Sequence, residues 1–442
     1  MSMLPQWLEK HLDRLPGTDR YLVAYSGGRD SHVLLHLLAR RFGKSSVPGL
    51  SAVHINHGLQ PEAGKWAAHC LEVCRKLDVP CRTIELKLAP ARGESPEAQA
   101  REARYQALES IIETGDVLMT AHHQQDQAET VLLQLFRGAG PAGLSAMPAL
   151  SRFGRGYMAR PLLDASVADI DDYARREQLC WIDDPTNQSF QYDRNFIRNR
   201  IIPILSGRWP ALARTISRSA RHCAESQELV DTIAAADLAE IRDSGTHTLA
   251  LPGLLELASS RARAVLRAWI RNENFPLPGS VQLERVLSEM TTAGRDRNPL
   301  VQWPGAEIRR FQDRLYIMQP MAPLNDDLSL VWDGHTTLRL PAGIGRLESC
   351  TGPGGLSQVH WRTGVIRISF RVHRQQRIRI AGRNHSTSFK NLFQQFAVPV
   401  WNRNRIPLVY LDDELAAVAD LCICEPFAVP ESEQGIHINW IR

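Results

Sequence analysis

The chain has 442 residues, 43% hydrophobic and 23% charged, with a net charge of +4 that selects no partner by itself. This length is too great for one ordinary compact core, so two or three domains are expected in a soluble protein. The sequence contains no apolar run that could span a bilayer and no signal peptide, and its eight scattered cysteines indicate a reducing cytoplasm rather than a cysteine zinc site.

Residues 20–190 alternate strand-like and helix-like segments. Short apolar segments predict strands at 21–25, 50–55 and 116–122, and an alternating pattern predicts one at 81–88. Helical spacing follows each of them, at 31–40, 65–77, 95–112 and 127–136. Repeated β-α units predict an α/β domain with a doubly wound parallel sheet and helices on both faces. Ligands of such sheets bind beyond the carboxyl ends of the strands.

Residues 193–290 contain no convincing strand and are predicted to be helical. Seven arginines and no acid lie between Arg194 and Arg221. Among them, Arg214, Arg218 and Arg221 are spaced i, i+4 and i+7, so we expect them to share one helix face.

From about residue 300 the chain is rich in short strands, glycine and proline, which predicts a C-terminal α+β domain. Residues 367–380 have a strand pattern, and 388–396 have that of a short helix. Ten Lys or Arg and no acid lie between Ser349 and Leu411, with aromatic residues interleaved at Phe370, Phe389 and Trp401. Two basic patches on a nearly neutral chain indicate a large polyanion held at more than one place. The alternative is a solvated basic face.

The most specific motif is SGGRDS (Ser26–Ser31), between the first predicted strand and its helix. Its two glycines permit tight bends close to a ligand. The free amides of the helix start and the Ser26 and Ser31 hydroxyls can form a cradle for an anion. Asp30 would repel a phosphate unless a cation lies between them, so we infer Mg²⁺.

Four further motifs accompany this loop. HINHGL (54–59) ends the second strand, and EAQAREARY (97–105) puts Glu97, Arg101 and Arg104 on one helix face. HHQQDQAET (122–130) places Asp126 and Glu129 three apart at a helix start, where they can hold Mg²⁺ or an ammonium group. DDPTN (183–187) precedes the helix that begins the first basic patch. Capped turns and helix-surface ion pairs are the structural alternatives.

SGGRDS resembles the pyrophosphatase loop of the ATP pyrophosphatase superfamily, whose members cleave ATP to AMP and pyrophosphate. The ordered set SGGxDS, HxNHGL, EAxARxxRY, HHxxDxxET, RGxGPAGLSAM, RPLL and DPTNxxxxxDRNxIR resembles the tRNA(Ile)-lysidine synthetase family over residues 21–205. The resemblance resumes at 366–421, in HSTSFKNLFQQF and VPVWNRNRIPLVY, whereas 215–330 match mainly in helical character. One departure is Gln125, where many relatives have Asp.

This resemblance implies a cytoplasmic carbon–nitrogen ligase that uses ATP and Mg²⁺. The C2 oxygen of the wobble cytidine in an isoleucine tRNA with the anticodon CAU would be adenylated. The ε-amine of L-lysine would then attack C2 and AMP would leave. The product, lysidine, pairs with A instead of G and changes the tRNA identity from methionine to isoleucine. The partners would be tRNA(Ile) and L-lysine, with no membrane, and a homodimer is compatible with the sequence.

The resemblance also implies roles for particular residues. Asp30 would hold Mg²⁺, and the catalytic residues would be Asp30, Arg101, Asp126 and Glu129. ATP would be bound by Ser26, Gly27, Gly28, Arg29, Asp30, Ser31, His54 and Asn56. Lysine and tRNA would be bound by Arg104, Asp126, Glu129, Arg194, Asn195, Arg198, Arg214, Arg218 and Arg221. We expect a catalytic domain at 1–208, a helical tRNA-binding domain at 209–325 and a C-terminal tRNA-binding domain at 326–442.

Three other classes of protein remain as alternatives. A tRNA thiolase of the same superfamily needs a persulfide-carrying cysteine or an iron–sulfur cluster, and the cysteines that precede the third motif are Cys70, Cys74 and Cys81. A small-molecule amide ligase would not need two basic patches. A non-enzymatic RNA-binding module would not need SGGRDS with its accompanying carboxylates.

Overall fold

A computed structural model describes residues 5–42, 49–56, 58, 62–86, 96–183, 192–294, 297–325, 327–372 and 376–441. The chain divides into two compact units, 1–229 and 230–442, and each is described by itself. Within the described ranges, no helix has the length and apolar character needed to cross a membrane.

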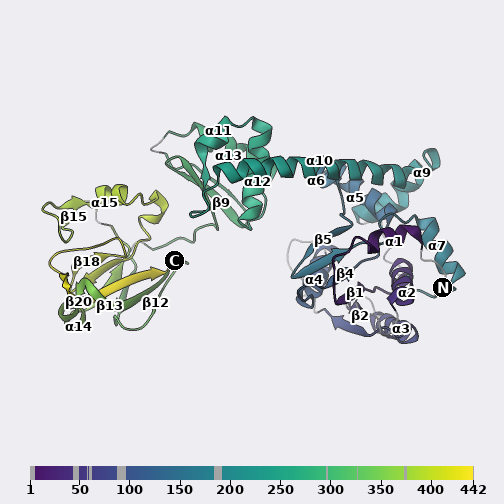
Figure 1. Cartoon of the computed structure of the whole chain (residues 1–442), viewed down its shortest axis with the longest axis horizontal. Helices are drawn as coiled ribbons and strands as arrows, with labels where there is room; N and C mark the ends of the chain where they lie inside the picture. Colours follow the sequence, from purple (N-terminus) through teal and green to yellow (C-terminus); the bar gives the residue numbers. More distant parts are fainter. Residues whose placement is uncertain are drawn as a thin grey trace. The chain divides into compact units, whose positions relative to one another are not determined.

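A six-stranded sheet of order β3-β2-β1-β4-β6-β5 forms the centre of the first unit (Figure 1). Five strands run parallel: β1 (Arg20–Ala24), β2 (Gly49–Asn56), β3 (Cys81–Glu85), β4 (Val117–Met119) and β6 (Gly156–Ala159). β5 (Leu150–Phe153) pairs antiparallel with β6 in a hairpin that the sequence did not predict. The four predicted strands are all present.

Helices cover both faces of this sheet. One face packs against α1 (Gln6–Leu12), α2 (Arg29–Phe42), α3 (Ala63–Lys76) and α7 (Val167–Arg176), and the other against α4 (Pro96–Ser110). Alternation along β1 produces both cores, because Tyr21 and Val23 join the first apolar cluster while Leu22 joins the second. The prediction of a doubly wound α/β domain is confirmed.

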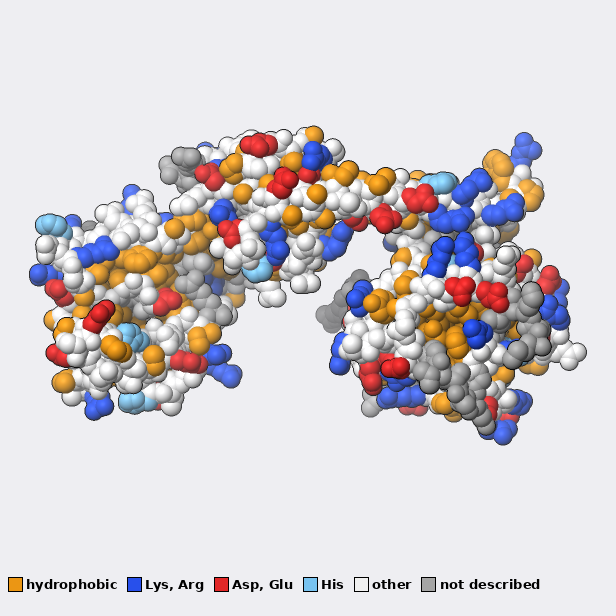
Figure 2. Space-filling view, viewed as in Figure 1, with side chains coloured by type: hydrophobic (Ala, Val, Ile, Leu, Met, Phe, Trp, Pro, Cys, Tyr) orange, Lys and Arg blue, Asp and Glu red, His pale blue; other side chains and the backbone are white. Residues whose placement is uncertain are grey.

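Helical segments follow the sheet. After α5 (Gln124–Phe136) and α6 (Pro141–Leu144) come α8 (Asp193–Phe196), a π-helical turn (Ile197–Ile201), α9 (Ile202–Arg208) and the long α10 (Leu212–Ile241). Arg214, Arg218 and Arg221 are exposed on α10, as their spacing predicted. Lys and Arg side chains gather over α9 and the start of α10 (Figure 2).

The first half of the second unit combines helices with a small sheet. α11 (Leu251–Glu256), α12 (Ser259–Asn272) and α13 (Ser280–Thr292) share one apolar core with an antiparallel sheet of β7 (Leu249–Ala250), β10 (Arg314–Met318), β9 (Ala306–Phe311) and β8 (Leu300–Trp303). Trp269 and Ile308 are completely buried there. The strands after residue 300 therefore pack with the preceding helices, and β7 is a short strand inside a stretch predicted to be helical.

The C-terminal part is α+β, as predicted. One sheet contains β11 (Ser329–Trp332), β14 (Ile366–Ser369), β17 (Leu408–Leu411), β18 (Glu414–Val418) and β19 (Cys422–Ile423). A second contains β12 (Leu338–Leu340), β13 (Gly345–Ser357) and β20 (Ala428–Ile441). The remaining elements are α14 (Gln358–Thr363), α15 (Phe389–Gln395) and the hairpin of β15 (Arg377–Ile378) with β16 (Thr387–Ser388).

The aromatic residues that lie among the basic residues of this part are core residues. Phe370 and Phe389 are buried, and Trp401 packs edge-on against Phe311 and Tyr316, with ring centroids 6.1 and 5.4 Å away. Burying large rings contributes more to folding than leaving them in water. The interleaving of these three side chains with basic residues therefore reflects packing of the core.

Candidate functional site

The SGGRDS loop connects β1 to α2. Gly27 has a φ of +86°, and a Cβ there would lie 2.9 Å from Cys70 Sγ, so the position requires glycine. Ser26 Oγ lies 3.0 Å from Ser31 Oγ and accepts a hydrogen bond from the Gly28 amide at 3.3 Å. The serines thus hold the loop closed at its base. The first amides of α2 have no acceptor within the helix and suit an anion.

Asp30 lies in a chain of charged contacts. Arg29 Nε donates to Asp30 at 2.8 Å, and Arg29 Nη1 donates to Asp171 at 2.6 Å. His123 Nε2 lies 3.5 Å from Asp30 and 3.4 Å from Asp126. Burial acts to raise the pKa of Asp30, but His123 and Arg29 outweigh it and hold the pKa below its usual value. Asp30 is therefore ionised and linked through His123 to Asp126.

Asp126 and Glu129 lie together on α5, and two arginines face them. Arg194 donates to Asp126 at 3.0 Å and to Glu129 at 2.9 Å. Arg198 donates to each of these carboxylates at 2.6 Å. Glu129 is completely buried, so guanidinium groups fill the positions where the sequence predicted a ligand ammonium.

The charges of this cluster are strongly coupled. Burial acts to raise the pKa of Asp126, but the charges of His123 and Arg194 lower it well below its usual range. Burial acts to lower the pKa of Arg198, but the hydrogen bond and the charge of Glu129 outweigh burial, so the pKa lies above its usual value. Asp126 and Arg198 therefore keep their charges at neutral pH, and Asp126 is a strong hydrogen-bond acceptor and a weak base while Arg198 stays in place.

Arg101 and Arg104 form a second group of cations near this cluster. Both lie over the Tyr105 ring, with Cζ 5.2 and 5.6 Å from its centroid. Burial lowers the pKa of Arg104, and the charges of Arg101 and Arg194 act in the same direction. Neither Arg101 nor Arg104 has a carboxylate partner within the described ranges of the chain. Their charge is thus free to attract an anion.

Arg160 is a site residue that the sequence reasoning missed. It ends β6, in the RPLL motif, and is 8% exposed. Its Nη1 donates to the Pro148 carbonyl at 2.7 Å, but its Nε is buried without a partner among the described residues. Burial lowers its pKa, and the charge of Arg101 adds to this. An arginine at the carboxyl end of a parallel strand was the signal that could have identified it.

His122 lies among these cations. Burial lowers the pKa of His122 to about 3, with the charges of Arg160, Arg194 and Arg104 in the same direction. The imidazole is therefore neutral at physiological pH, and Thr120 Oγ1 lies 2.9 Å from its Nδ1. The carboxyl ends of β4 and β6 thus present a field of positive charge, which suits phosphate.

Several other predicted residues make local contacts. His54 is buried, with Nδ1 3.0 Å from the Tyr25 carbonyl, and Asn56 accepts a hydrogen bond from the Gly58 amide at 2.9 Å. Gln125 donates to Glu129 at 3.4 Å. Asn195 lies beside Arg194 on α8. The Glu97 side chain and residues 184–187 of the DDPTN motif lie outside the described residues.

The start of α10 belongs to the same unit as the site. Ser217 Oγ donates to the Gln124 carbonyl at 3.4 Å, which connects α10 to the first turn of α5. The charge of Arg221 helps to lower the pKa of Asp164, after the hydrogen bond from His11. Arg214 and Arg218 stay exposed, so α10 presents its basic face in the same unit as the charged cluster.

A parallel sheet whose first strand leads through SGGRDS into a helix defines a PP-loop protein, and residues 4–205 match the family model described as PP-loop domain. Residues 249–316 match the TilS substrate binding domain, and 366–440 the TilS substrate C-terminal domain. The chain belongs to the tRNA(Ile)-lysidine synthase family.

Curated relatives match over nearly the full length. The chain is 39% identical over 436 residues to the tRNA(Ile)-lysidine synthase of Coxiella burnetii, covering 98% of this chain and 96% of that one. It is 40% identical over 428 residues to that of Methylococcus capsulatus, covering 96% and 97%. Among solved structures, the U34-tRNA thiolase NcsA from Methanococcus maripaludis is 19% identical with a TM-score of 0.42, over 50% of this chain and 77% of that one, which is too low to support an argument.

Proposed function

We propose that this chain is a carbon–nitrogen ligase that joins L-lysine to C2 of the wobble cytidine in the CAU anticodon of tRNA(Ile). ATP is cleaved to AMP and pyrophosphate. The observation that carries this proposal is the position of His123, whose Nε2 lies 3.5 Å from Asp30 and 3.4 Å from Asp126. A loop for phosphate and a carboxylate pair for an ammonium group are therefore neighbours, as an ATP-dependent lysine ligase requires.

In the first step the loop binds the pyrophosphate part of ATP. The amides at the start of α2 and the Ser26 and Ser31 hydroxyls donate to it. Within the described ranges no three His, Cys, Asp or Glu side chains are arranged to hold a metal, but Mg²⁺ often binds one carboxylate and several phosphate oxygens. Asp30 fits that role, and Mg²⁺ held there would offset charge on the phosphates.

The arginine group then acts on the adenylated cytidine. Transfer of AMP to the C2 oxygen converts a poor leaving group into a good one. No described carboxylate pairs with Arg101, Arg104 or Arg160, so we infer that their charge is available to the phosphate of the adenylate. Preorganised cations of this kind stabilise the developing negative charge without reorganising during the reaction.

In the second step lysine reaches Asp126 and Glu129. Its ammonium group displaces a guanidinium of Arg194 or Arg198 from these carboxylates. Removing an arginine also raises the basicity of Asp126, which then accepts the proton that the ε-amine must lose before it attacks C2. His54 and Asn56 remain beside the loop, where the adenine is proposed to lie.

Pyrophosphate release, with lysine and tRNA omitted in turn, tests the proposed function. We expect release to require tRNA, and lysidine to form only with lysine. Release with neither substrate, or lysine-independent sulfur transfer, would contradict the proposal. A thiolase is disfavoured because Cys70 is completely buried and burial raises its pKa to about 12.

Arg160→Met should lower kcat for adenylation about 30-fold, with a smaller change in KM for tRNA, because the guanidinium acts on charge that develops in the reaction. Arg152→Ala is the matched control, since Arg152 lies in the same β5–β6 hairpin and stacks on Tyr157 at 4.4 Å. Steady-state pyrophosphate kinetics measure both variants. An equal decrease of kcat in the two variants would mean that Arg160 stabilises the hairpin and does not act on the reaction.

Charge reversal in the two basic patches should weaken tRNA binding in a roughly additive way. We expect Arg214→Glu with Arg218→Glu to act on one contact and Arg383→Glu on another, because separated contacts on one long RNA couple weakly. Each reversal should also reduce the dependence of affinity on salt, since fewer counterions are released. Filter binding across a salt series measures the affinity and its dependence on salt. If a reversal leaves the salt dependence unchanged, that patch is a solvated surface that does not contact tRNA.

A further inference from the structure

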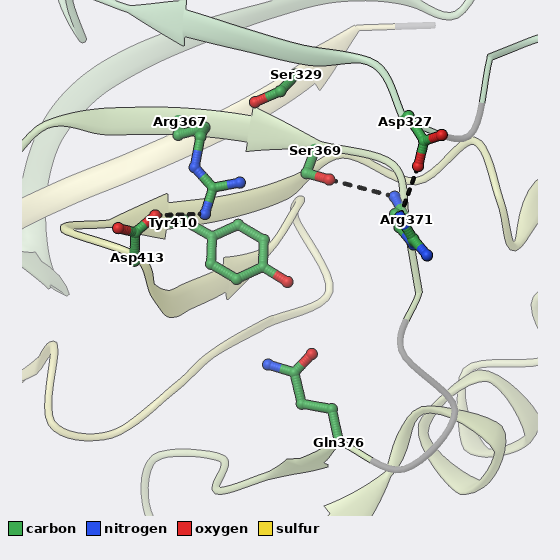
Figure 3. A pocket seen from close by; sticks show the side chains of 8 residues that line it. All are labelled: Asp327, Ser329, Arg367, Ser369, Arg371, Gln376, Tyr410 and Asp413. Carbon is green, nitrogen blue, oxygen red and sulfur yellow. Dashed lines mark hydrogen bonds and ion pairs between the residues drawn. The ribbon is translucent and has the colours of Figure 1, made fainter.

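A pocket of about 500 Å³ lies on one face of the C-terminal sheet (Figure 3). Its floor follows from strand register. Ser329 on β11 lies opposite Ser369 on β14, and Arg367 on β14 lies opposite Tyr410 on β17. Residues two apart on a strand share a face, so these four side chains stand on the same side of the sheet. The rim adds Asp327, Arg371, Gln376 and Asp413.

Among the described residues, the ion-pair partners of two arginines of the pocket are exposed carboxylates. Arg367 pairs with Asp413 at 2.7 Å, and Arg371 pairs with Asp327 at 2.6 Å. The two aspartate side chains are 87% and 72% exposed, and ion pairs of that kind are weak. Both guanidinium groups can therefore exchange water-exposed partners for a phosphate, which they bind in a bidentate manner.

The interior of the pocket offers a ring and an amide. Tyr410 is buried below Arg367, whose Cζ lies 4.8 Å from the ring centroid, so the guanidinium is held in a fixed place above the ring. Gln376 Oε1 is buried and has no hydrogen-bond partner in the described part of the chain. Figure 3 shows the Gln376 amide directed toward Tyr410. An unpaired buried acceptor favours a ligand that donates a hydrogen bond.

We propose that this pocket binds one unpaired nucleotide. Its phosphate is held by Arg367 and Arg371, and the exocyclic amine of its base donates to Gln376 Oε1, with Ser329 and Ser369 completing the polar contacts. A volume of about 500 Å³ is large enough for a nucleotide. Adenine, cytosine and guanine carry such an amine, whereas uracil would have to donate from its ring N3–H instead.

The tRNA is the favoured source of this nucleotide. The chain from Ser349 to Leu411 has ten Lys or Arg and no acid, and this excess of positive charge favours a long polyanion over a free nucleotide. A free mononucleotide has the same chemistry and would use the same contacts. This inference rests on the proposed function, because tRNA is the substrate proposed above.

Arg367→Ala and Arg371→Ala in the full chain test the phosphate contact. Each should weaken binding of a tRNA transcript about tenfold and reduce the salt slope by about one. Arg346→Ala is the matched control, because Arg346 on β13 is an exposed arginine paired with Glu348 at 2.8 Å outside the pocket. It should change affinity less than twofold. If Arg367→Ala unfolds, Arg367→Lys replaces it as the test variant, because lysine keeps the charge but cannot bind phosphate in a bidentate manner.

Gln376→Leu tests the base contact. Its affinity for the tRNA transcript should fall about fivefold, while its affinity for a blunt, fully paired RNA duplex should match that of the unchanged protein. Calorimetry with AMP, CMP and UMP distinguishes the two sources. Suppose that Arg371→Ala no longer binds AMP and CMP but binds tRNA as tightly as the unchanged protein. The occupant is then a free mononucleotide, and the nucleotide pocket itself is still supported.

The pocket is contradicted if its variants bind both tRNA and mononucleotides as the unchanged protein does. The proposed function fails separately, if the unchanged protein releases no pyrophosphate with tRNA, ATP and lysine. The kcat at saturating tRNA should be the same in the pocket variants, since the pocket acts on binding alone.

Discussion

Asp30→Ala is expected to reduce tRNA-dependent pyrophosphate release by about a thousandfold, while affinity for tRNA stays within about twofold. The reason lies in the charge balance at the loop. Asp30 is the acid of SGGRDS, and His123 and Arg29 keep its pKa low, so it is ionised at neutral pH. A carboxylate there is tolerable beside phosphate only with a cation between them. Its loss therefore removes a contact that the reacting phosphates need.

Asp171→Ala separates this role from a structural one. Arg29 donates to Asp171 at 2.6 Å as well as to Asp30, so removing Asp171 also loosens Arg29 but leaves the carboxylate of the loop. We expect a loss of less than about tenfold in that variant. Pyrophosphate release at saturating Mg²⁺ measures the rate in both variants, and filter binding measures their affinity for tRNA. Normal release by Asp30→Ala would remove Asp30 from the mechanism.

Glu129→Gln and Asp126→Asn should raise KM for lysine about 100-fold and allow adenylated tRNA to accumulate. Both changes keep the shape of the side chain and remove a charge that attracts an ammonium group. The first half-reaction needs neither carboxylate directly, so adenylation should fall much less. A quench of the reaction followed by chromatography of the tRNA measures the adenylated intermediate.

Arg198→Met is the informative companion variant. Arg198 donates to both Asp126 and Glu129, so its removal frees the carboxylates that lysine needs. KM for lysine should therefore fall several-fold, opposite in sign to the effect of Glu129→Gln. If KM rises equally in both variants, and thermal unfolding shows equal destabilisation, the four charged residues form a structural cluster and lysine binds elsewhere.

The local parts of this structure could be predicted from the sequence. Short apolar segments located β1, β2 and β4, because a buried parallel strand carries apolar side chains on both faces. Alternation located β3, the edge strand. SGGRDS could be located because its signals are local. The glycines that allow a positive φ, as Gly27 has at +86°, stand directly before the first residues of the helix. The basic face of α10 followed from helical spacing alone.

The long-range parts could not be predicted. Arg194 and Arg198 meet Asp126 and Glu129 across more than sixty residues, and helical spacing says nothing about such partners. Arg160 lies in the RPLL motif, but its buried and unpaired Nε becomes visible only in the folded structure. The burial of the aromatic residues in the second basic patch could not be predicted either, because interleaving in sequence does not tell which side of a strand or helix faces the core.

The arginine group also bears on how the protein keeps its fold. Arg101, Arg104 and Arg160 carry like charges in a partly buried space, where no described carboxylate pairs with them. Nucleotide then acts as a ligand that the folded chain binds and the unfolded chain does not. At a concentration 100 times its Kd, ATP would add about 2.7 kcal/mol to the free energy of unfolding of the first unit. We therefore expect ATP to raise the midpoint of thermal unfolding of this unit and to slow its proteolysis.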